Sequence, residues 1–108
     1  MSLLDKYIDY IRDIRRYSER TVQIYDAALR DYVSFAHKDS DSSAVTDDDM
    51  VSSMNVSEIR SYEVSLLDRG YSPKTVNLHI SALSSFCRYL MKNQKLKSNP
   101  VRSVVKPK

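Results

Sequence analysis

Apolar residues recur at intervals of three and four along four stretches of the chain, and this spacing places them on one face of a helix. It predicts helices over residues 2–15, 18–37, 57–69 and 72–93. The residues expected to be buried are, helix by helix, Leu4, Tyr7, Ile8, Ile11 and Ile14; Tyr25, Ala28, Leu29, Tyr32, Phe35 and Ala36; Ile59, Tyr62, Leu66 and Leu67; and Val76, Ile80, Leu83, Phe86, Cys87 and Leu90.

Residue types with known positional preferences mark the ends of these helices. Ser18 and Ser72 stand where an N-cap hydroxyl accepts a hydrogen bond from a first-turn amide. Pro73 follows at the first helical position, which suits its fixed φ and its missing N–H. Gly70 lies just beyond the third helix, where a left-handed residue commonly ends a helix. The boundary residues therefore agree with the apolar spacing.

Two segments outside the four helices are polar. Residues 38–55 are rich in serine and aspartate and predict an acidic loop, with one short turn of helix after Thr46, whose side chain would cap it. The Asn99-Pro100 pair and a further proline predict an irregular basic tail. We therefore divide the chain into a helical domain at residues 1–93 and a tail at residues 94–108.

Composition narrows the fold class to all-α. The chain has 108 residues but only one glycine and three prolines, whereas a β-protein needs many tight turns. We expect a bundle of four to five helices. The single cysteine, Cys87, excludes an internal disulfide and a cysteine-cluster metal site. No apolar run approaches the roughly 18 residues of a membrane span. We expect no cofactor, no metal, no membrane contact and a cytoplasmic location.

Charge is distributed unevenly along the chain, whose net charge is +3. Residues 1–38 carry seven basic and six acidic side chains, residues 39–68 carry one and eight, and residues 69–108 carry nine basic and no acidic ones. A long segment without a carboxylate indicates a polyanionic partner. The alternative is that this segment is a solvated basic face followed by a basic tail.

Two of the helix starts share one sequence pattern. Residues 17–22 (Tyr-Ser-Glu-Arg-Thr-Val) match residues 71–76 (Tyr-Ser-Pro-Lys-Thr-Val), and an Ala-Leu pair follows each at the same distance. The chain is therefore expected to form two helical hairpins. A helix N-terminus favours a phosphate, and basic and hydroxyl side chains there add donors. The residues predicted to hold one phosphate at each start are Ser18, Arg20 and Thr21, and Ser72, Lys74 and Thr75. The alternative is that the hydroxyls only cap the helices and the cations only solvate the surface.

Residues 69–90, followed by Asn99-Pro100 and Lys106-Pro107-Lys108, resemble the N-terminal core-binding domain of tyrosine recombinases, the family of phage integrases and Xer-type recombinases. The first hairpin agrees through its start at residues 17–21, so the resemblance extends from Leu4 to Lys108. It implies a SAM-like all-α fold of two crossed helical hairpins. It also implies that the domain clamps one face of a DNA duplex while a C-terminal catalytic domain clamps the other.

Four further candidate DNA-binding residues lie in the stretch that carries the resemblance: Arg69, Asn77, His79 and Arg88. Asn77 and His79 carry amide and imidazole groups, which pair with base edges. This chain departs from the family, however, because members often have arginines at two positions of the last helix that are Leu78 and Ser84 here.

The chain lacks the residues with which the family catalyses its reaction, in which a tyrosine attacks a phosphodiester with help from arginines, a lysine and histidines. Neither His37 nor His79 begins the His-x-x-Arg box of the family. We therefore expect this chain alone not to be an enzyme. Lys106-Pro107-Lys108 resembles the start of a linker to a catalytic domain, and the full-length protein is expected to be a tyrosine recombinase.

The leading hypothesis is a duplex-DNA-binding module of a site-specific recombinase, which contacts mainly phosphates through its two helix starts. Its further partners would be other recombinase subunits in a tetrameric synapse on DNA, and the isolated domain would be monomeric. The alternative is a helical protein-interaction module with no direct DNA contact. Salt separates the two, because affinity for DNA falls steeply with salt.

Overall fold

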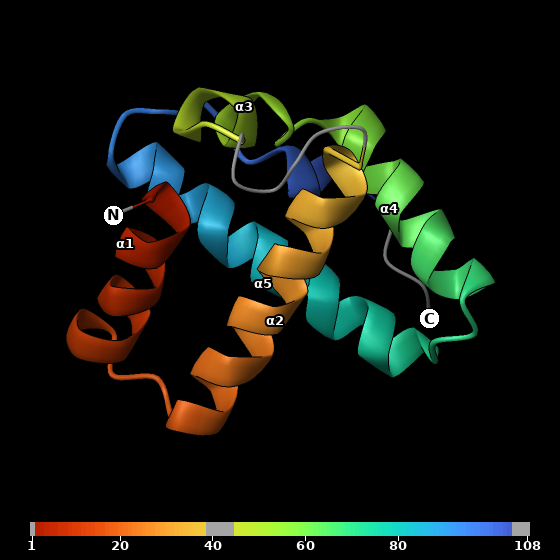
Figure 1. Cartoon of the computed structure of the whole chain (residues 1–108), viewed down its shortest axis with the longest axis horizontal. Coiled ribbons are helices and arrows are strands. Elements are labelled where there is room, and N and C mark those ends of the chain that lie inside the picture. The colour runs from red at the N-terminus through yellow and green to blue at the C-terminus, as the bar shows by residue number, and fades with distance from the viewer. Residues whose placement is uncertain (1, 39–44, 105–108) are drawn as a thin grey trace.

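The computed structural model describes residues 2–38 and 45–104, and every regular element in these ranges is helical. The order along the chain is α1 (Leu3–Asp9), the π-helical turn η1 (Tyr10–Ile14), α2 (Glu19–Ala36), α3 (Asp47–Ser52), α4 (Val56–Asp68), α5 (Pro73–Lys92) and the 3-10 turn η3 (Pro100–Ser103). The hairpin of α1 and α2 crosses the hairpin of α4 and α5, with α2 lying over α5 (Figure 1). The all-α prediction is confirmed.

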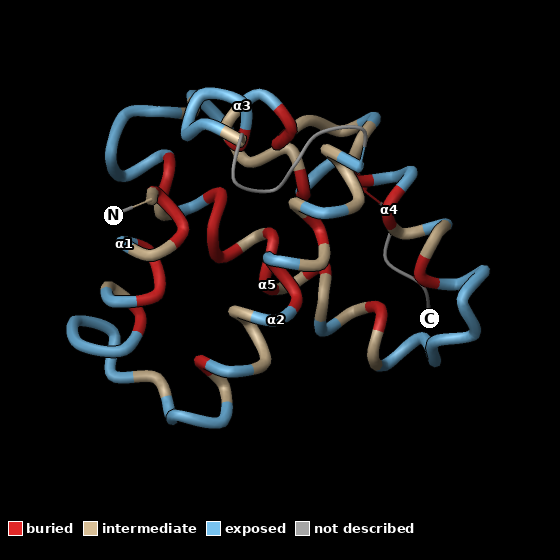
Figure 2. Tube along the Cα trace, viewed as in Figure 1, coloured by how far each residue is buried: buried red, intermediate tan, exposed pale blue. Residues whose placement is uncertain are grey.

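Helix α5 lies at the centre of the core because apolar residues recur along its whole length. All six of its predicted buried residues have no exposed surface: Val76, Ile80, Leu83, Phe86, Cys87 and Leu90. Figure 2 shows further buried positions on each of the helices around it. Burial raises the pKa of the Cys87 thiol to about 12, as expected for a cysteine that acts as a small core residue.

Buried tyrosines join the helices through both their rings and their hydroxyls. The ring of Tyr7 in α1 packs edge-on against Phe86 in α5, with centroids 5.1 Å apart. Its hydroxyl donates to Oγ of Ser85 at 2.7 Å. The rings of Tyr32 in α2 and Tyr62 in α4 pack the same way at 5.0 Å. These pairs add geometric specificity to apolar burial, because edge-on ring contacts hold only at defined angles.

Two residues of the predicted apolar faces are exposed. Ile14 is 68% exposed because residues 10–14 wind as a π-helix, whose wider turn shifts Ile14 off the face of α1. Leu67 is 41% exposed in the last turn of α4. Conversely, Val22 is buried, although the predicted face of the second helix omits it. Tyr25, Phe35 and Ala36 of that face are only partly buried.

The prediction of an irregular tail is wrong for residues 100–103, which form the 3-10 turn η3. Val101 and Val104 are buried in the core. The Arg60 side chain of α4 also donates to the carbonyl of Ser103 at 3.2 Å. The turn therefore packs as part of the helical domain, and residues 105–108 lie outside the described residues.

The predicted short helix after Thr46 is confirmed as α3. The Thr46 hydroxyl accepts from the Asp49 N–H at 3.1 Å, and the Asp49 carboxylate accepts from the Thr46 N–H at the same distance. This reciprocal pair is a capping box, which satisfies two first-turn donors. Residues 39–44 of the acidic loop lie outside the described residues.

Helices α4 and α5 both end on a left-handed residue. Gly70 has a φ of 86°, as predicted, and the N–H of Tyr71 donates back to the carbonyl of Leu66 at 3.2 Å. The same arrangement closes α5 around Gln94, whose φ is 62°. There the N–H of Lys95 donates back into the last turn. Both ends are Schellman motifs, which use the last free carbonyls of a helix.

Candidate nucleic-acid interface

The two helix starts that share a sequence pattern also share one geometry. Ser18 caps α2 and accepts from the Thr21 N–H at 3.2 Å, and Ser72 caps α5 and accepts from the Thr75 N–H at 3.3 Å. Each serine hydroxyl also donates to Oγ1 of the same threonine, at 2.9 Å in α2 and 3.1 Å in α5. Both N-cap predictions are confirmed, as is the placement of Pro73 at the first helical position.

Each start leaves donors directed at solvent. The cap serine accepts from the third amide, so the amide of the preceding residue, Arg20 or Lys74, has no acceptor within its helix. The threonine oxygen receives the serine hydrogen, which leaves the threonine's own hydroxyl hydrogen available. The side chains of Arg20 and Lys74 are exposed, and neither forms an ion pair within the described ranges. Amide, hydroxyl and cation together are the donor set that binds a phosphate at a helix end.

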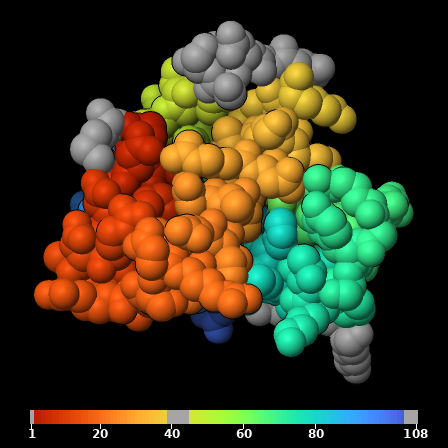
Figure 3. Space-filling view, turned by 60° about the horizontal axis from the view of Figure 1, so that its bottom comes forward, coloured from red at the N-terminus to blue at the C-terminus, as the bar shows by residue number. Residues whose placement is uncertain are grey.

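Both starts lie on one side of the molecule. Figure 3 turns the lower end of Figure 1 toward the viewer and shows the orange start of α2 and the teal start of α5 on that side. One extended polyanion can therefore reach both.

The start of α5 differs from that of α2 in the charge of its first turn. Its first turn contains no acidic residue, whereas Glu19 lies in the first turn of α2. Glu19 is held by Arg12, whose Nε and Nη2 each donate to it at 3.2 Å. The α2 start therefore carries a neutralised pair beside its free cation.

Arg69, a predicted DNA-binding residue, is already paired with a carboxylate. Its Nη2 donates to Oδ2 of Asp31 in α2 at 2.9 Å, and its guanidinium lies 6.0 Å from the ring centroid of Tyr62 and 5.4 Å from that of Tyr71. The pair bridges the end of α4 to α2. Asp31 was missed by sequence reasoning because it lies 38 residues away from Arg69 and carries no motif.

His79, the predicted reader of base edges, faces the same network. Its Nδ1 lies 3.0 Å from the hydroxyl of Tyr62, which donates to Oδ2 of Asp31 at 2.6 Å. Because the phenol hydrogen goes to Asp31, the Nδ1–H of a neutral His79 is the donor to Tyr62. His79 therefore uses Nδ1 in a contact with Tyr62 of α4. The predicted contact with a base edge would have to use its other ring nitrogen, Nε2.

Burial sets the protonation of this network. It lowers the pKa of His79 by disfavouring the imidazolium, and this outweighs the attraction of Asp31. For Asp31 burial acts the other way, but the hydrogen bonds from Arg69 and Tyr62 outweigh it and hold the carboxyl pKa below its ordinary value. The network therefore combines an ionised Asp31 with a neutral His79 near neutral pH.

Two clefts with cationic linings flank the exposed side of α5. The first, the tyrosine cleft, has a volume of about 260 Å³ and is lined by Tyr10, Ile11, Arg15, Tyr17, Ser85, Arg88, Tyr89 and Lys92. The second, the η3 cleft, is lined by Ser84, Arg88, Met91, Lys97, Ser98, Asn99, Arg102 and Ser103. Neither lining includes a carboxylate.

Arg88, a predicted site residue, is exposed and lines both clefts, whereas Asn77 is partly buried in the second turn of α5. Arg15 and Lys92 were not predicted.

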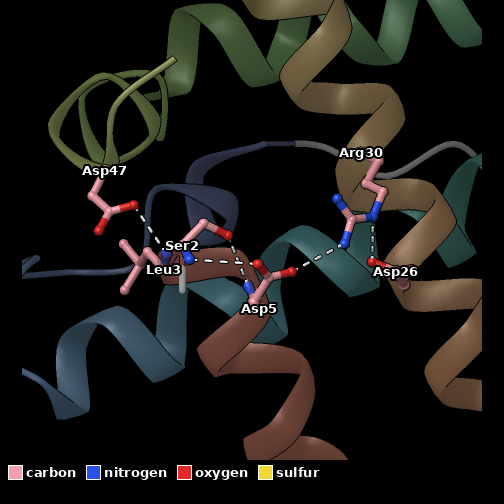
Figure 4. A network of polar contacts seen from close by, with 6 residues as sticks. All are labelled: Ser2, Leu3, Asp5, Asp26, Arg30 and Asp47. Carbon is pink, nitrogen blue, oxygen red and sulfur yellow. Dashed lines mark hydrogen bonds and ion pairs between the residues drawn. The ribbon is translucent and has the colours of Figure 1, made fainter. Parts of the chain in front are cut away.

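Acidic side chains gather at the other end of the molecule, around the starts of α1 and α3. Arg30 Nη2 donates to Asp5 at 3.3 Å and Arg30 Nε donates to Asp26 at 2.8 Å, while Asp47 accepts from the Leu3 N–H at 2.9 Å (Figure 4). In Figure 1 this end lies opposite the start of α2. The acidic side chains Asp5, Asp26 and Asp47 therefore lie away from the start of α2.

The described residues show neither a cluster of three or more histidine, cysteine or acidic side chains able to hold a metal ion nor a helix long and apolar enough to cross a membrane.

Known proteins are similar in sequence to this chain over nearly its whole length. The chain is 27% identical to the tyrosine recombinase XerC of Bacillus pumilus over 98% of this chain and 32% of that protein. It is 34% identical to XerC of Pediococcus pentosaceus over 96% of this chain and 33% of that protein. It is 27% identical to the tyrosine recombinase XerD of Oceanobacillus iheyensis over 97% and 33%. The chain thus spans about a third of the length of the curated relatives it matches. No solved structure matches it.

The family model described as the phage integrase N-terminal SAM-like domain matches residues 3–96. These residues run from the start of α1 past the end of α5 and include both capped helix starts. The chain therefore belongs to the family of phage integrase N-terminal SAM-like domains.

Proposed function

We propose that this chain is a duplex-DNA-binding module of a tyrosine recombinase and that it holds one backbone phosphate at the start of α2 and another at the start of α5. The observation that carries the proposal is the pair of matching Ser-x-Arg/Lys-Thr starts on one side of the molecule. The names of the curated relatives, all tyrosine recombinases, support the choice of DNA as the polyanion.

The whole protein is then a recombinase whose strand cleavage resides in a part that this chain does not include. Its duplex partner and the other subunits of a tetrameric synapse belong to the same proposal. This chain alone would bind DNA without cutting it, as a monomer.

The proposal is tested by fluorescence anisotropy on two duplexes of different sequence over a salt series. Arg20→Ala and Lys74→Ala should each weaken binding about tenfold, equally on both duplexes, because a charged hydrogen bond to a phosphate is lost. Each should also reduce the slope of log K against log salt by about 0.9. Lys74→Ala should have the larger effect, because no carboxylate lies in the first turn of α5.

Two controls accompany these variants. Lys6→Ala removes the same charge from the exposed side of α1, near the acidic end, and should leave the slope unchanged. Thr75→Val should cost about 1 kcal/mol of binding free energy for one hydrogen bond without changing the slope. Circular dichroism checks the fold of each variant. Wild-type affinity and slope in both Arg20→Ala and Lys74→Ala would show that the two starts are only capped helix ends.

One observation favours a second candidate function, a protein-interaction surface. Val64, Leu67 and Tyr71 are exposed around the end of α4. An interface built on them would keep its affinity as salt rises and would weaken in Val64→Asp. The salt series therefore separates the two functions.

A further inference from the structure

The tyrosine cleft lies directly beside the start of α2. Tyr17, which lines it, is the residue before the cap Ser18. The opposite wall comes from the C-terminal half of α5, where Arg88 and Lys92 occupy one side of the helix. The cleft therefore adjoins the α2 start, and a duplex bound at that start would also pass the cleft.

The cations of this cleft are held in place without being neutralised. The guanidinium of Arg15 lies over the ring of Tyr17, 5.9 Å from its centroid, and Nζ of Lys92 lies 5.1 Å from the ring centroid of Tyr10. Lys92 also donates to the Tyr10 hydroxyl at 3.4 Å. An aromatic face attracts a cation but leaves its net charge intact.

Three other arginines of the molecule are neutralised by carboxylates. Arg12, Arg30 and Arg69 each form an ion pair with a carboxylate. Within the described ranges Arg15, Arg88 and Lys92 form none, and Arg88 bonds instead to the neutral hydroxyl of Ser84 at 2.9 Å. Three unneutralised cations around one small cleft repel one another, so an anion between them would lower their energy.

The backbone is shaped to bring the two walls together. After the π-helical turn η1, Arg16 adopts a left-handed φ of 58°. The N–H of Tyr17 then donates back to the carbonyl of Ile11 at 2.9 Å. This reversal turns Arg15 and Tyr17 toward α5, at the conformational cost of a left-handed arginine.

We propose that the tyrosine cleft binds a third backbone phosphate of the duplex, next to the phosphate held by the α2 start. The inference rests on the proposed function and extends its footprint to the C-terminal half of α5. Two arginine forks and one lysine point charge suit a phosphate, which offers several acceptor oxygens at once.

The test uses Arg15→Gln and Lys92→Gln in the same salt series. Each should lower the slope by about 0.9, so that raising salt from about 50 to about 200 mM weakens binding about 3.5-fold less than in the wild type. The matched control is Lys95→Gln, an exposed lysine just after α5 that does not line the cleft. A second arm titrates the wild type with inorganic pyrophosphate and follows the ring resonances of Tyr10 and Tyr17 by NMR.

The outcomes separate this inference from the proposed function. Lower slopes in both cleft variants and an unchanged Lys95→Gln support the third phosphate. Wild-type slopes in Arg15→Gln and Lys92→Gln, while Lys74→Ala lowers the slope, overturn the cleft and leave the helix starts standing. Wild-type slopes in all of these variants overturn both. Shifts with pyrophosphate alongside wild-type slopes overturn the assignment to the duplex, because the cleft would then take a free phosphoanion.

Discussion

A single buried phenol connects three helices of this domain. The Tyr62 hydroxyl in α4 lies within hydrogen-bond distance of Asp31 in α2 and His79 in α5. Arg69 completes the network by pairing with the same carboxylate. The network therefore ties the α4–α5 turn, and with it the start of α5, to the opposite hairpin.

His79 should make stability depend on pH. Burial lowers the pKa of His79 in the folded state below the 6.5 of an exposed imidazole. At a pH between the folded and the unfolded pKa, the unfolded chain therefore binds a proton that the native protein does not. The free energy of unfolding should therefore be full above about pH 7 and fall as the pH drops toward about 5.5. Urea unfolding at both pH values measures the difference.

His79→Gln should remove most of that difference, whereas His37→Gln, which changes the other histidine of the chain, should retain it. An equal pH dependence in His79→Gln and the wild type would mean that burial does not perturb this imidazole.

At the scale of the helix, the two Schellman ends differ in one residue type. Gly70 occupies the left-handed position after α4 at no steric cost, whereas Gln94 occupies the equivalent position after α5 with a side chain. The same backbone geometry is therefore built once from a favourable residue and once from an unfavourable one.

Exchanging these residue types should shift stability in opposite directions. Gly70→Ala should lower the free energy of unfolding by about 1 kcal/mol, although a Cβ there meets no atom within 4 Å, because the strain is in the backbone. Gln94→Gly should raise it by about 0.5 to 1 kcal/mol. Denaturant titration measures both, and a loss of stability in Gln94→Gly would show that its side chain contributes more than the left-handed backbone costs.

The helices could be predicted where local signals and apolar spacing agree. Ser72, Pro73 and the unbroken stripe of α5 placed that helix to within one residue at each end. The prediction that Ile14 is buried was wrong, because its spacing fits the apolar face of an α-helix while the chain forms a π-helical turn there. The pattern of apolar residues does not indicate whether a turn is α-helical or π-helical, so the shift of Ile14 could not be predicted from it.

At the scale of the whole molecule, the segment after α5 closes the core. Val101 and Val104 are buried beside α4 and α5. Val101→Ala and Val104→Ala should each lower the free energy of unfolding by about 1 to 3 kcal/mol, because each leaves a small cavity. Val64→Ala, at a position 56% exposed, is the matched control and should change it by less than about 0.5 kcal/mol. Equal effects at all three positions in thermal or urea unfolding would contradict this role for the segment.

Only the part of the candidate site that rests on local sequence patterns could be predicted. The two helix starts are local patterns, so the sequence alone located Arg20 and Lys74. The Asp31–Arg69 pair and the cleft lined by Arg15 and Lys92 each join residues far apart in the chain, and no local pattern connects them. Whether a cation is neutralised depends on which carboxylate the fold brings beside it. Charge counts along the chain therefore could not distinguish Arg69 from Lys74.

The paired rings of the core also give this protein an optical signature. The chain has eight tyrosines and no tryptophan, so its near-ultraviolet spectrum is a tyrosine spectrum. Tyr7 against Phe86 and Tyr32 against Tyr62 are fixed in asymmetric surroundings where the two hairpins meet. Near-ultraviolet circular dichroism therefore reports the docking of one hairpin on the other, separately from the helix content seen in the far ultraviolet. A state with its helices formed but its hairpins undocked would keep the far-ultraviolet signal and lose the near-ultraviolet one. No label is needed to detect it.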